Sequence, residues 1–332
     1  MKSNKLLFIV IFFLFLFSQI FSLKTIKNKN IQKLNKINTN NFPHLYENIS
    51  WFSDESLNYS KITKFNSEWM SKLSDNLNIS NITIPGTHDS CTFEFFFDDI
   101  EIIEDIIDFF GMTQSWNFTE QLYAGIRYFD IRVGSDGLIY HGLLLTTTSF
   151  LDIFNEIKNF FKKNPNESII MRIKYEVVFS CYYDEEKCFE NNIKKILDEN
   201  ENILYTENYI PLLKEIRGKV FIIMEDKEYK NCLNWKSNKL KIQDYYNLSG
   251  EQEKAIQMKK QFILKYFNLS LNENNFLYIN HCSAVAFYSL MSIKYVAMRI
   301  NETPFFYKKY KGIIPLDFPS EELVLKIINQ NF

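Results

Sequence analysis

The chain has 332 residues, of which 46% are hydrophobic and 17% aromatic, enough to bury one large core or two smaller ones. Its formal net charge of −2 gives no electrostatic reason to expect a nucleic-acid partner or a polybasic membrane anchor. The five cysteines show no Cys-x-x-Cys or Cys/His spacing that would indicate a zinc site.

The N-terminus is typical of a secreted protein. A short basic start, MKSNK, precedes the apolar run LLFIVIFFLFLFSQIF, after which the chain turns polar at SLKTIKNKN. We predict a secretory signal peptide over residues 1–22, with a retained anchor as the alternative. Residues 23–65 are rich in Asn and Lys without hydrophobic periodicity, which predicts a flexible lead-in to a single domain over residues 66–332.

A secreted chain should carry disulfides and glycans. Five cysteines predict two disulfides and one free thiol, and Cys181 and Cys188 bracket YYDEEK closely enough to close a local loop. The pairing stays open among the other three, Cys91, Cys232 and Cys282. Nine Asn-x-Ser/Thr sequons predict a glycoprotein, although we expect Asn81 to enter a buried strand.

From Trp69 onward, short β-branched segments alternate with helical patterns. We predict strands over residues 81–86, 126–133, 138–142, 168–176, 219–226, 275–283 and 311–318. Their continuous apolar character suits strands that are covered on both faces. A helical pattern over 149–165 ends at Asn164–Pro165. This repeated order predicts an α/β fold with a parallel sheet, and the size of the chain favours a closed barrel.

Residues 93–111, FEFFFDDIEIIEDIIDFFG, have apolar side chains at helical spacing and an acidic opposite face. We predict an amphipathic helix packed on the barrel. The alternative is a rim helix that inserts Phe and Ile side chains into a bilayer, although its acidic face would be repelled by anionic lipid.

Polar residues cluster where the predicted strands end, which is where a barrel of this kind has its catalytic mouth. They are His88, Asp89, Asp130, Arg132, His141, Lys174, Glu176, Glu225, His281 and Asp317. Polar residues in such positions are either solvated in separate loops or converge into one site. Because so many of them lie at strand ends, we favour an enzyme.

Two histidines and an arginine suit acid–base cleavage of a phosphodiester. One imidazole removes a proton from the attacking hydroxyl, and the other donates one to the leaving oxygen. A guanidinium neutralises charge that grows on the phosphate oxygens, and carboxylates orient the imidazoles. The residues that supply this chemistry are His88, Asp89, Arg132, His141 and Asp317.

The segments IPGTHDS, QLYAGIRYFDIRV, YHG, PNESIIMRIKYE and GIIPLDFP follow one another along the chain. Together they resemble the X region of phosphatidylinositol-specific phospholipase C over about residues 66–325, and the bacterial-type, calcium-independent branch fits best. The resemblance implies a distorted TIM (β/α)8 barrel that cleaves phosphatidylinositol-type lipids into diacylglycerol and a cyclic inositol phosphate. It also implies a membrane phospholipid as a transient partner, and we expect a monomer.

The resemblance assigns a role to each residue that matches the family pattern. His88 would deprotonate the inositol 2-hydroxyl with Asp317 behind it, Arg132 would bind the phosphate, and His141 would protonate the diacylglycerol oxygen with help from Asp89. The substrate-binding residues that it implies are Asp130, Lys174 and, in the segment IQDYY, Asp244 and Tyr246.

We predict that neither a metal nor a cofactor takes part. Calcium binds 6–8 oxygen ligands, and the calcium-dependent relatives supply several acidic or amide groups around the phosphate. Here Arg132 follows FDI, where it would repel a calcium ion.

The chain departs from the family near the end of the strand predicted over 219–226, where the bacterial enzymes have an inositol-binding arginine and this chain has Glu225 or Asp226. The preferred substrate therefore stays open among phosphatidylinositol, a phosphorylated form and a glycosyl-phosphatidylinositol anchor. We interpret Trp235 as a rim residue and His281 as a structural histidine with satisfied nitrogens. Glu225 is expected to be solvated or paired.

Two alternatives to this function stay open. One is a related barrel phosphodiesterase acting on glycerophosphodiesters or sphingolipids, which would depend on acidic metal ligands. The other is a catalytically silent module that binds lipid or inositol.

Overall fold

The computed structural model describes residues 64–96, 111–142, 144–176, 184–273, 275–286 and 291–332. The predicted signal peptide lies outside the described residues, and so does the predicted lead-in apart from its last two residues. Over the part of the chain that is described, no helix combines the length and the apolar character needed to cross a bilayer.

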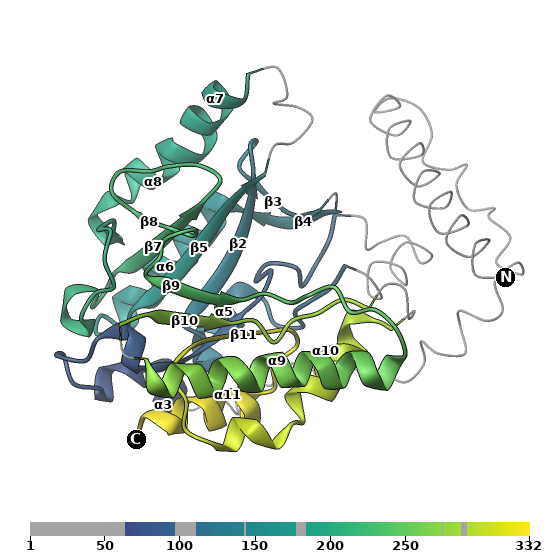
Figure 1. Cartoon of the computed structure of the whole chain (residues 1–332). Helices are drawn as coiled ribbons and strands as arrows, with labels where there is room; N and C mark the ends of the chain where they lie inside the picture. Colours follow the sequence, from purple (N-terminus) through teal and green to yellow (C-terminus); the bar gives the residue numbers. More distant parts are fainter. Residues whose placement is uncertain (1–63, 97–110, 143, 177–183, 274, 287–290) are drawn as a thin grey trace, which may run out of the picture. The chain divides into compact units, whose positions relative to one another are not determined.

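The centre of the fold is a curled parallel sheet (Figure 1). In the described residues eight strands follow one another in the order β6–β7–β5–β2–β1–β11–β10–β9, and every neighbouring pair is parallel. The strands are β1 (Thr83–Thr87), β2 (Tyr128–Gly134), β5 (Ile169–Glu176), β6 (Leu204–Tyr205), β7 (Val220–Glu225), β9 (Leu240–Gln243), β10 (Leu277–Asn280) and β11 (Gly312–Leu316).

β1 and β11, the first and the last of these strands along the chain, are neighbours in the sheet, as in a barrel. β1 pairs with β2 on one side and with β11 on the other. Among the described strands no ladder joins β6 to β9, so the sheet remains open there. The predicted distorted (β/α)8 barrel is confirmed in this open form.

Three further strands lie off this path. β3 (Leu138–His141) and β4 (Leu144–Ser149) form an antiparallel hairpin, and β3 also pairs with β2. β8 (Leu233–Asn234) pairs with β7 in parallel. β4, β6, β8 and β9 were not predicted from the sequence, because each is very short or carries polar residues within it.

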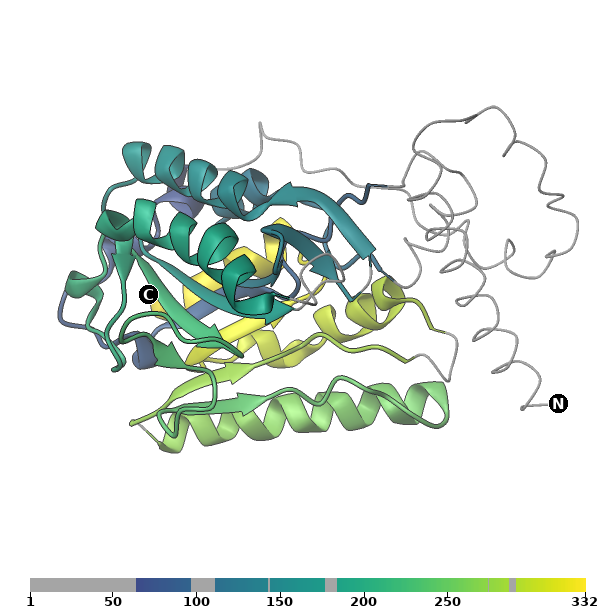
Figure 2. The same cartoon turned by 90° about the horizontal axis from the view of Figure 1, so that it is seen from above.

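Helices cover both sides of the sheet. They are α3 (Lys64–Ser67), α5 (Phe118–Ala124), α6 (Phe150–Lys163), α7 (Glu185–Cys188), α8 (Lys195–Glu199), α9 (Gln252–Asn272), α10 (Ile293–Asn301) and α11 (Glu321–Ile328). Figure 2 shows α6 and α8 on one side of the strands and α9 on the other, alongside β9 and β10.

The predicted helix over 149–165 is confirmed as α6. It begins with a capping box in which Ser149 accepts from the backbone N–H of Asp152, and its last residue is followed by Asn164. The buried side chains of α6 recur at intervals of three or four residues and pack on the core: Phe150, Ile153, Phe154, Ile157, Phe160 and Phe161.

The apolar interior forms two clusters. The larger one is built on β1, β2, β5 and β7, and the smaller one lies between β11 and the helices α9, α10 and α11. Strand β11 contributes to both, with Ile313 in the larger cluster and Ile314 in the smaller. Adjacent strand residues point to opposite faces, so this strand is covered on both sides, as its apolar sequence predicted.

Several local predictions are wrong. The helix expected from residue 93 does not begin there, because Phe95 forms an isolated β-bridge with Thr146; residues 97–110 lie outside the described residues. Asn81 is exposed and ends a short 3-10 turn before β1, so it does not enter the buried strand.

The second predicted disulfide is absent from the described residues. Cys91, Cys232 and Cys282 are all free thiols. Cys91 belongs to the larger apolar cluster and Cys282 to the smaller, so each is packed separately. Cys188 is disulfide-bonded, and its predicted partner Cys181 lies outside the described residues.

A buried ion pair lies at the end of the barrel opposite to the strand C-termini. Arg127 precedes β2 and Glu167 precedes β5, and Arg127 Nε donates to Glu167 Oε2 at 2.8 Å. Both side chains are fully buried. Glu167 also accepts from the backbone N–H of Ser71 at 2.8 Å, and the Arg127 guanidinium donates to three backbone carbonyls within 2.8 Å.

We expect Glu167→Gln to lower the free energy of unfolding by about 3–5 kcal/mol, because it leaves a buried guanidinium without its counter-charge. Urea unfolding of the purified variant measures the loss. The matched control is Glu253→Gln, which breaks the exposed pair with Arg299 and should change the free energy by no more than about 1 kcal/mol. Equal effects of the two substitutions would contradict the prediction.

Candidate active site

The turn after β1 places the first two site residues. Gly86 lies against β2 so closely that an added Cβ would stand 2.7 Å from the Tyr128 side chain, so only glycine fits. The turn is fastened to β2, because Ser90 N donates to the Asp130 carbonyl at 2.9 Å. Asp89 adopts a left-handed backbone conformation with φ of 42°, which is uncommon outside glycine. His88 and Asp89 therefore stand at the C-terminal end of the first barrel strand.

His88 is held on both ring nitrogens. Its Nδ1 lies 2.9 Å from Oδ1 of Asp317, the residue that follows β11. Its Nε2 lies 3.1 Å from Nη2 of Arg132 on β2. A guanidinium only donates, so in the neutral form of the ring Nε2 carries the lone pair and the proton sits on Nδ1, facing Asp317. This is the tautomer that a general base acting through Nε2 needs.

Asp89 is the centre of the cluster. Its carboxylate forms an ion pair with Arg132, lies 3.3 Å from His141 Nε2 and lies 3.6 Å from His88 Nε2. The side chain of Asp89 is 1% exposed, whereas those of His141 and Arg132 are about one-fifth exposed. On the far side of the His141 ring, Nδ1 donates to the Gly111 carbonyl at 2.7 Å. Both histidines thus present Nε2 to the same carboxylate.

These carboxylates change the acidity of His88. Burial lowers its pKa, but the negative charges of Asp89 and Asp317 outweigh burial and raise the pKa to about 9. The same cluster affects Arg132: burial opposes its charge, yet Asp89 and Asp130 raise its pKa. Burial raises the pKa of Asp317, against the opposing effect of His88.

We expect an NMR titration of the imidazole resonances to give a pKa of about 9 for His88 in the wild type. In Asp317→Asn the value should fall toward the ordinary 6.5, because an anion that favours the imidazolium is removed. Protonation of His88 stabilises the fold fully below about pH 6.5, and that contribution is lost as the pH rises through about 9. An unchanged pKa in the variant would show that Asp317 does not act on His88.

Arg172 on β5 is a site residue that was not predicted from the sequence. Its guanidinium Nη1 donates to both carboxylate oxygens of Asp130 at 3.1 Å, and Nε donates to Glu225 Oε2 at 2.7 Å. The guanidinium also stacks on the Trp235 ring, with Cζ 4.0 Å from the ring centroid. Arg172 shares a strand face with Lys174, so the alternation of side chains along a strand could have identified it.

Arg172 also explains how an acidic residue, Glu225, is accommodated at the end of β7. The expectation that Glu225 is solvated or paired is confirmed, since it is bound to Arg172 from the neighbouring strand. The acidic residue therefore faces the mouth with its charge balanced by a buried cation.

Asp130 lies beneath the rest of the cluster. It is fully buried, and its Oδ2 lies 3.9 Å from Arg132 Nη2. Burial raises the pKa of Asp130, but Arg172 and Arg132 outweigh burial and hold the pKa below its usual range. In this position the Asp130 carboxylate balances the charge of the two guanidinium groups.

The remaining predicted site residues lie farther out. Lys174 pairs with Glu176 at 3.1 Å, as the shared strand face allowed. Asp244 and Tyr246 follow β9 and are both exposed. Trp235 is 8% exposed and covers Arg172, which places it deeper than the predicted rim.

His281 differs from its prediction. It is fully buried after β10, yet neither ring nitrogen has a hydrogen-bond partner among the described residues. It is therefore not the satisfied structural histidine that the sequence suggested.

Gln114 is a supporting residue that no sequence signal indicated. Its side-chain Nε2 donates to the His88 carbonyl at 2.7 Å and to the Leu316 carbonyl at 3.0 Å. It thereby fastens the turn that carries His88 to the end of β11, next to Asp317. The side chain is fully buried, so this bridge is part of the framework of the site.

Three groups at this site could serve as metal ligands: donor atoms of His88, Asp89 and Asp130 lie within 4.8 Å of one another. Both carboxylates, however, face guanidinium groups, Asp89 that of Arg132 and Asp130 that of Arg172. A divalent cation would have to approach two fixed positive charges, and calcium needs more oxygen ligands than this group offers. The donor set does not fit a calcium site, and metal independence stays a prediction.

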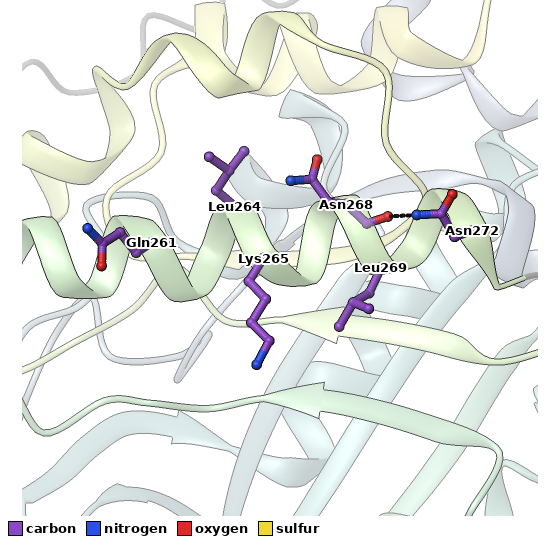
Figure 3. A pocket seen from close by; sticks show the side chains of 6 residues that line it. All are labelled: Gln261, Leu264, Lys265, Asn268, Leu269 and Asn272. Atoms are coloured by element: carbon purple, nitrogen blue, oxygen red, sulfur yellow. Dashed lines mark hydrogen bonds between the residues drawn. The ribbon is translucent and has the colours of Figure 1, made fainter.

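A separate hollow of about 440 Å³ runs along α9 (Figure 3). Its lining residues are Gln261, Leu264, Lys265, Asn268, Leu269 and Asn272. All six belong to the one helix and none belongs to the cluster around Asp89. The chemistry of the chain is therefore concentrated at the strand ends.

The chain matches known proteins along most of its length. Residues 105–226 match the family model "Phosphatidylinositol-specific phospholipase C, X domain". A 1-phosphatidylinositol phosphodiesterase of Listeria monocytogenes is 30% identical over 285 residues, which cover 80% of this chain and 84% of that protein. A protein of the same name from Staphylococcus aureus is 26% identical over 258 residues, covering 68% and 77%.

The fold agrees with these matches. The structure of phosphatidylinositol-specific phospholipase C from Listeria monocytogenes superposes with a TM-score of 0.68 and 28% sequence identity, over 80% of this chain and 99% of that one. The similarity in sequence and in fold thus covers four-fifths of this chain. The chain belongs to the phosphatidylinositol-specific phospholipase C family and is of its bacterial type.

Proposed function

We propose that the chain cleaves phosphatidylinositol-type lipids at the phosphodiester bond on the glycerol side. The observation that carries the proposal is the cluster in which Asp89 joins Arg132, His141 and His88 within 3.6 Å while Asp317 holds the far side of His88. The names of the similar bacterial proteins support the same substrate class.

In the proposed reaction, His88 Nε2 removes the proton from the inositol 2-hydroxyl. That oxygen attacks the phosphorus, and the bond from phosphorus to the glycerol oxygen breaks. His141 donates a proton from Nε2 to the departing oxygen, which leaves as the hydroxyl of diacylglycerol. The other product is a cyclic inositol phosphate, and the charge of its phosphate is unchanged in the overall step.

The surrounding groups favour each transfer. Asp317 stabilises the imidazolium that forms on His88, as the raised pKa of that ring indicates. Arg132 donates toward the position of His88 Nε2 and is partly exposed, so it can reach the phosphate oxygens that face the base. Asp89 lies 3.3 Å from His141 Nε2, the nitrogen that would deliver the proton, and so orients the ring.

The test is cleavage of phosphatidylinositol in detergent micelles with excess EDTA, followed by ³¹P NMR of the water-soluble product. We expect cleavage to continue in EDTA and a cyclic phosphodiester to appear first. Parallel assays with a phosphorylated phosphatidylinositol and with a glycosyl-phosphatidylinositol anchor rank the three lipids.

Other outcomes would point to the alternatives. Activity that EDTA abolishes, on glycerophosphodiesters or sphingolipids, would favour the metal-dependent phosphodiesterase. Binding of inositol lipid without turnover would favour the silent binding module. The proposal also retains the predictions that the protein is secreted, monomeric and in transient contact with the membrane.

A further inference from the structure

His281 has buried polar atoms that the fold itself does not use. The backbone of the residue is fixed, because its N–H donates to the Gln243 carbonyl at 2.9 Å and its carbonyl accepts from Gln243 Nε2 at 2.8 Å. Its side chain is fully buried, and neither Nδ1 nor Nε2 has a partner in the described part of the chain. Buried polar groups are normally hydrogen-bonded, so two unpartnered ring nitrogens beside the site leave both a donor and an acceptor for a bound ligand or for water.

The ring lies beside the proposed base. Its centroid is 5.8 Å from that of His88, with the two rings nearly perpendicular, and 6.2 Å from that of Trp235. Trp235 in turn stacks on Arg172, the residue that binds Asp130 and Glu225. His281 therefore belongs to the wall of the site on the side of β9 and β10, near the exposed Asp244.

The charge state of the ring limits what it can bind. Burial lowers the pKa of His281 to about 3, with Asp244 and Asp130 opposing and His88 and Arg172 reinforcing the shift. The ring is neutral at physiological pH, with one nitrogen as donor and the other as acceptor. A phosphate offers only acceptors and an ammonium only donors, whereas a hydroxyl both donates and accepts and so matches a neutral imidazole.

We propose that His281 is a specificity-determining residue that hydrogen-bonds a hydroxyl of the substrate's polyol ring, other than the one that attacks the phosphorus. This inference rests on the proposed function. The rings of His88 and Trp235 pack edge-on against the ring of His281, so a substrate hydroxyl reaches its nitrogens only if one of these side chains shifts. The residue distinguishes a polyol headgroup from headgroups that carry no hydroxyl at that position.

The test compares His281→Phe with His281→Gln. Phenylalanine keeps an aromatic ring in the same space and removes both nitrogens, whereas glutamine keeps a donor and an acceptor. We expect His281→Phe to lower kcat/KM for phosphatidylinositol about 10- to 100-fold without lowering the melting temperature, because the folded chain loses no hydrogen bond. His281→Gln should recover part of the activity.

Substrates that lack a single hydroxyl identify the contact. We expect the wild type to cleave one deoxy-inositol analogue of phosphatidylinositol, modified away from the 2-position, markedly less well than the parent lipid. His281→Phe should cleave that analogue and the parent lipid equally well. A wild type that treats every analogue alike would overturn the proposal, even if the phenylalanine variant failed to fold.

Tyr310→Phe is the matched control. Tyr310 precedes β11, at the opposite end of the strand from Asp317, and its hydroxyl is also buried without a partner among the described residues. Its removal should leave kcat/KM unchanged. If His281→Phe behaves in the same way, His281 is only a packing residue and the proposal is wrong.

Binding of free myo-inositol separates this inference from the proposed function. We expect myo-inositol to raise the melting temperature of the wild type and of Tyr310→Phe but not that of His281→Phe. If these shifts are seen but the wild type does not cleave phosphatidylinositol, the proposed function is wrong and the role of His281 in binding the polyol is retained. Equal shifts in all three proteins, or no shift in any, would overturn the role of His281.

Discussion

Replacing His88 with alanine is expected to lower kcat/KM for phosphatidylinositol by about 10²- to 10⁴-fold, the range typical of a lost general base. The reason is geometric: Nε2 is the ring nitrogen left to accept a proton once Nδ1 is bound to Asp317 at 2.9 Å. The measurement is initial-rate kinetics in mixed micelles at several substrate concentrations. We expect the loss mainly in kcat, because the imidazole acts on the reacting hydroxyl.

Added imidazole is the control for this variant. The alanine substitution leaves a partly open space where the ring stood, so a small base from solution can enter and restore part of the rate. Recovery that grows with imidazole concentration would identify the missing group as a base. A variant that retains more than about one-tenth of the wild-type rate would contradict a role for His88 in proton transfer.

Arg132→Lys is expected to lower kcat by about 10²- to 10³-fold, although the charge at this position is retained. The guanidinium contacts Asp89 and His88 together, and a guanidinium can also fork onto two phosphate oxygens. An ammonium is a compact point charge and cannot repeat that arrangement. The same micelle assay measures the change in kcat, with a lipid that carries sulfur in place of one non-bridging phosphate oxygen as a second substrate.

The control for this substitution is Arg299→Lys, on α10. Arg299 pairs with Glu253 on α9 and is about one-third exposed, so its replacement should leave kcat unchanged. If Arg132→Lys were as active as the control, the phosphate would be neutralised by some other group. The buried Arg172 would then be the first residue to examine.

The sequence predicts the barrel because its central strands consist mainly of apolar and β-branched residues. β5 and β7 read as continuous buried runs, and both were found within one or two residues of their bounds. The polar segment LKIQ forms β9 through pairing with β10, a tertiary contact that no local pattern reveals. The long helix α9 was missed because its apolar residues alternate irregularly with lysines.

The cluster around Asp89 was predictable for a similar reason. Its members lie on or directly after strands that the sequence marks clearly, so their convergence follows from the barrel. Arg172 was not predicted, although it shares a strand face with Lys174, and Gln114 lies in a loop that no motif marks. His281 was predicted to be a satisfied structural histidine, and only its three-dimensional neighbours show that its nitrogens have no partner.

The position of β11 in the sheet determines when His88 and Asp317 come together. This strand lies between β1 and β10, and it brings Asp317 to a histidine 229 positions earlier in the chain. A nascent chain that has not yet delivered its last strand has the base but not the carboxylate behind it. Contacts of such long sequence separation form late and slowly. We therefore expect turnover to require that β11 has paired with β1, so that an assay of turnover also reports on this long-range contact.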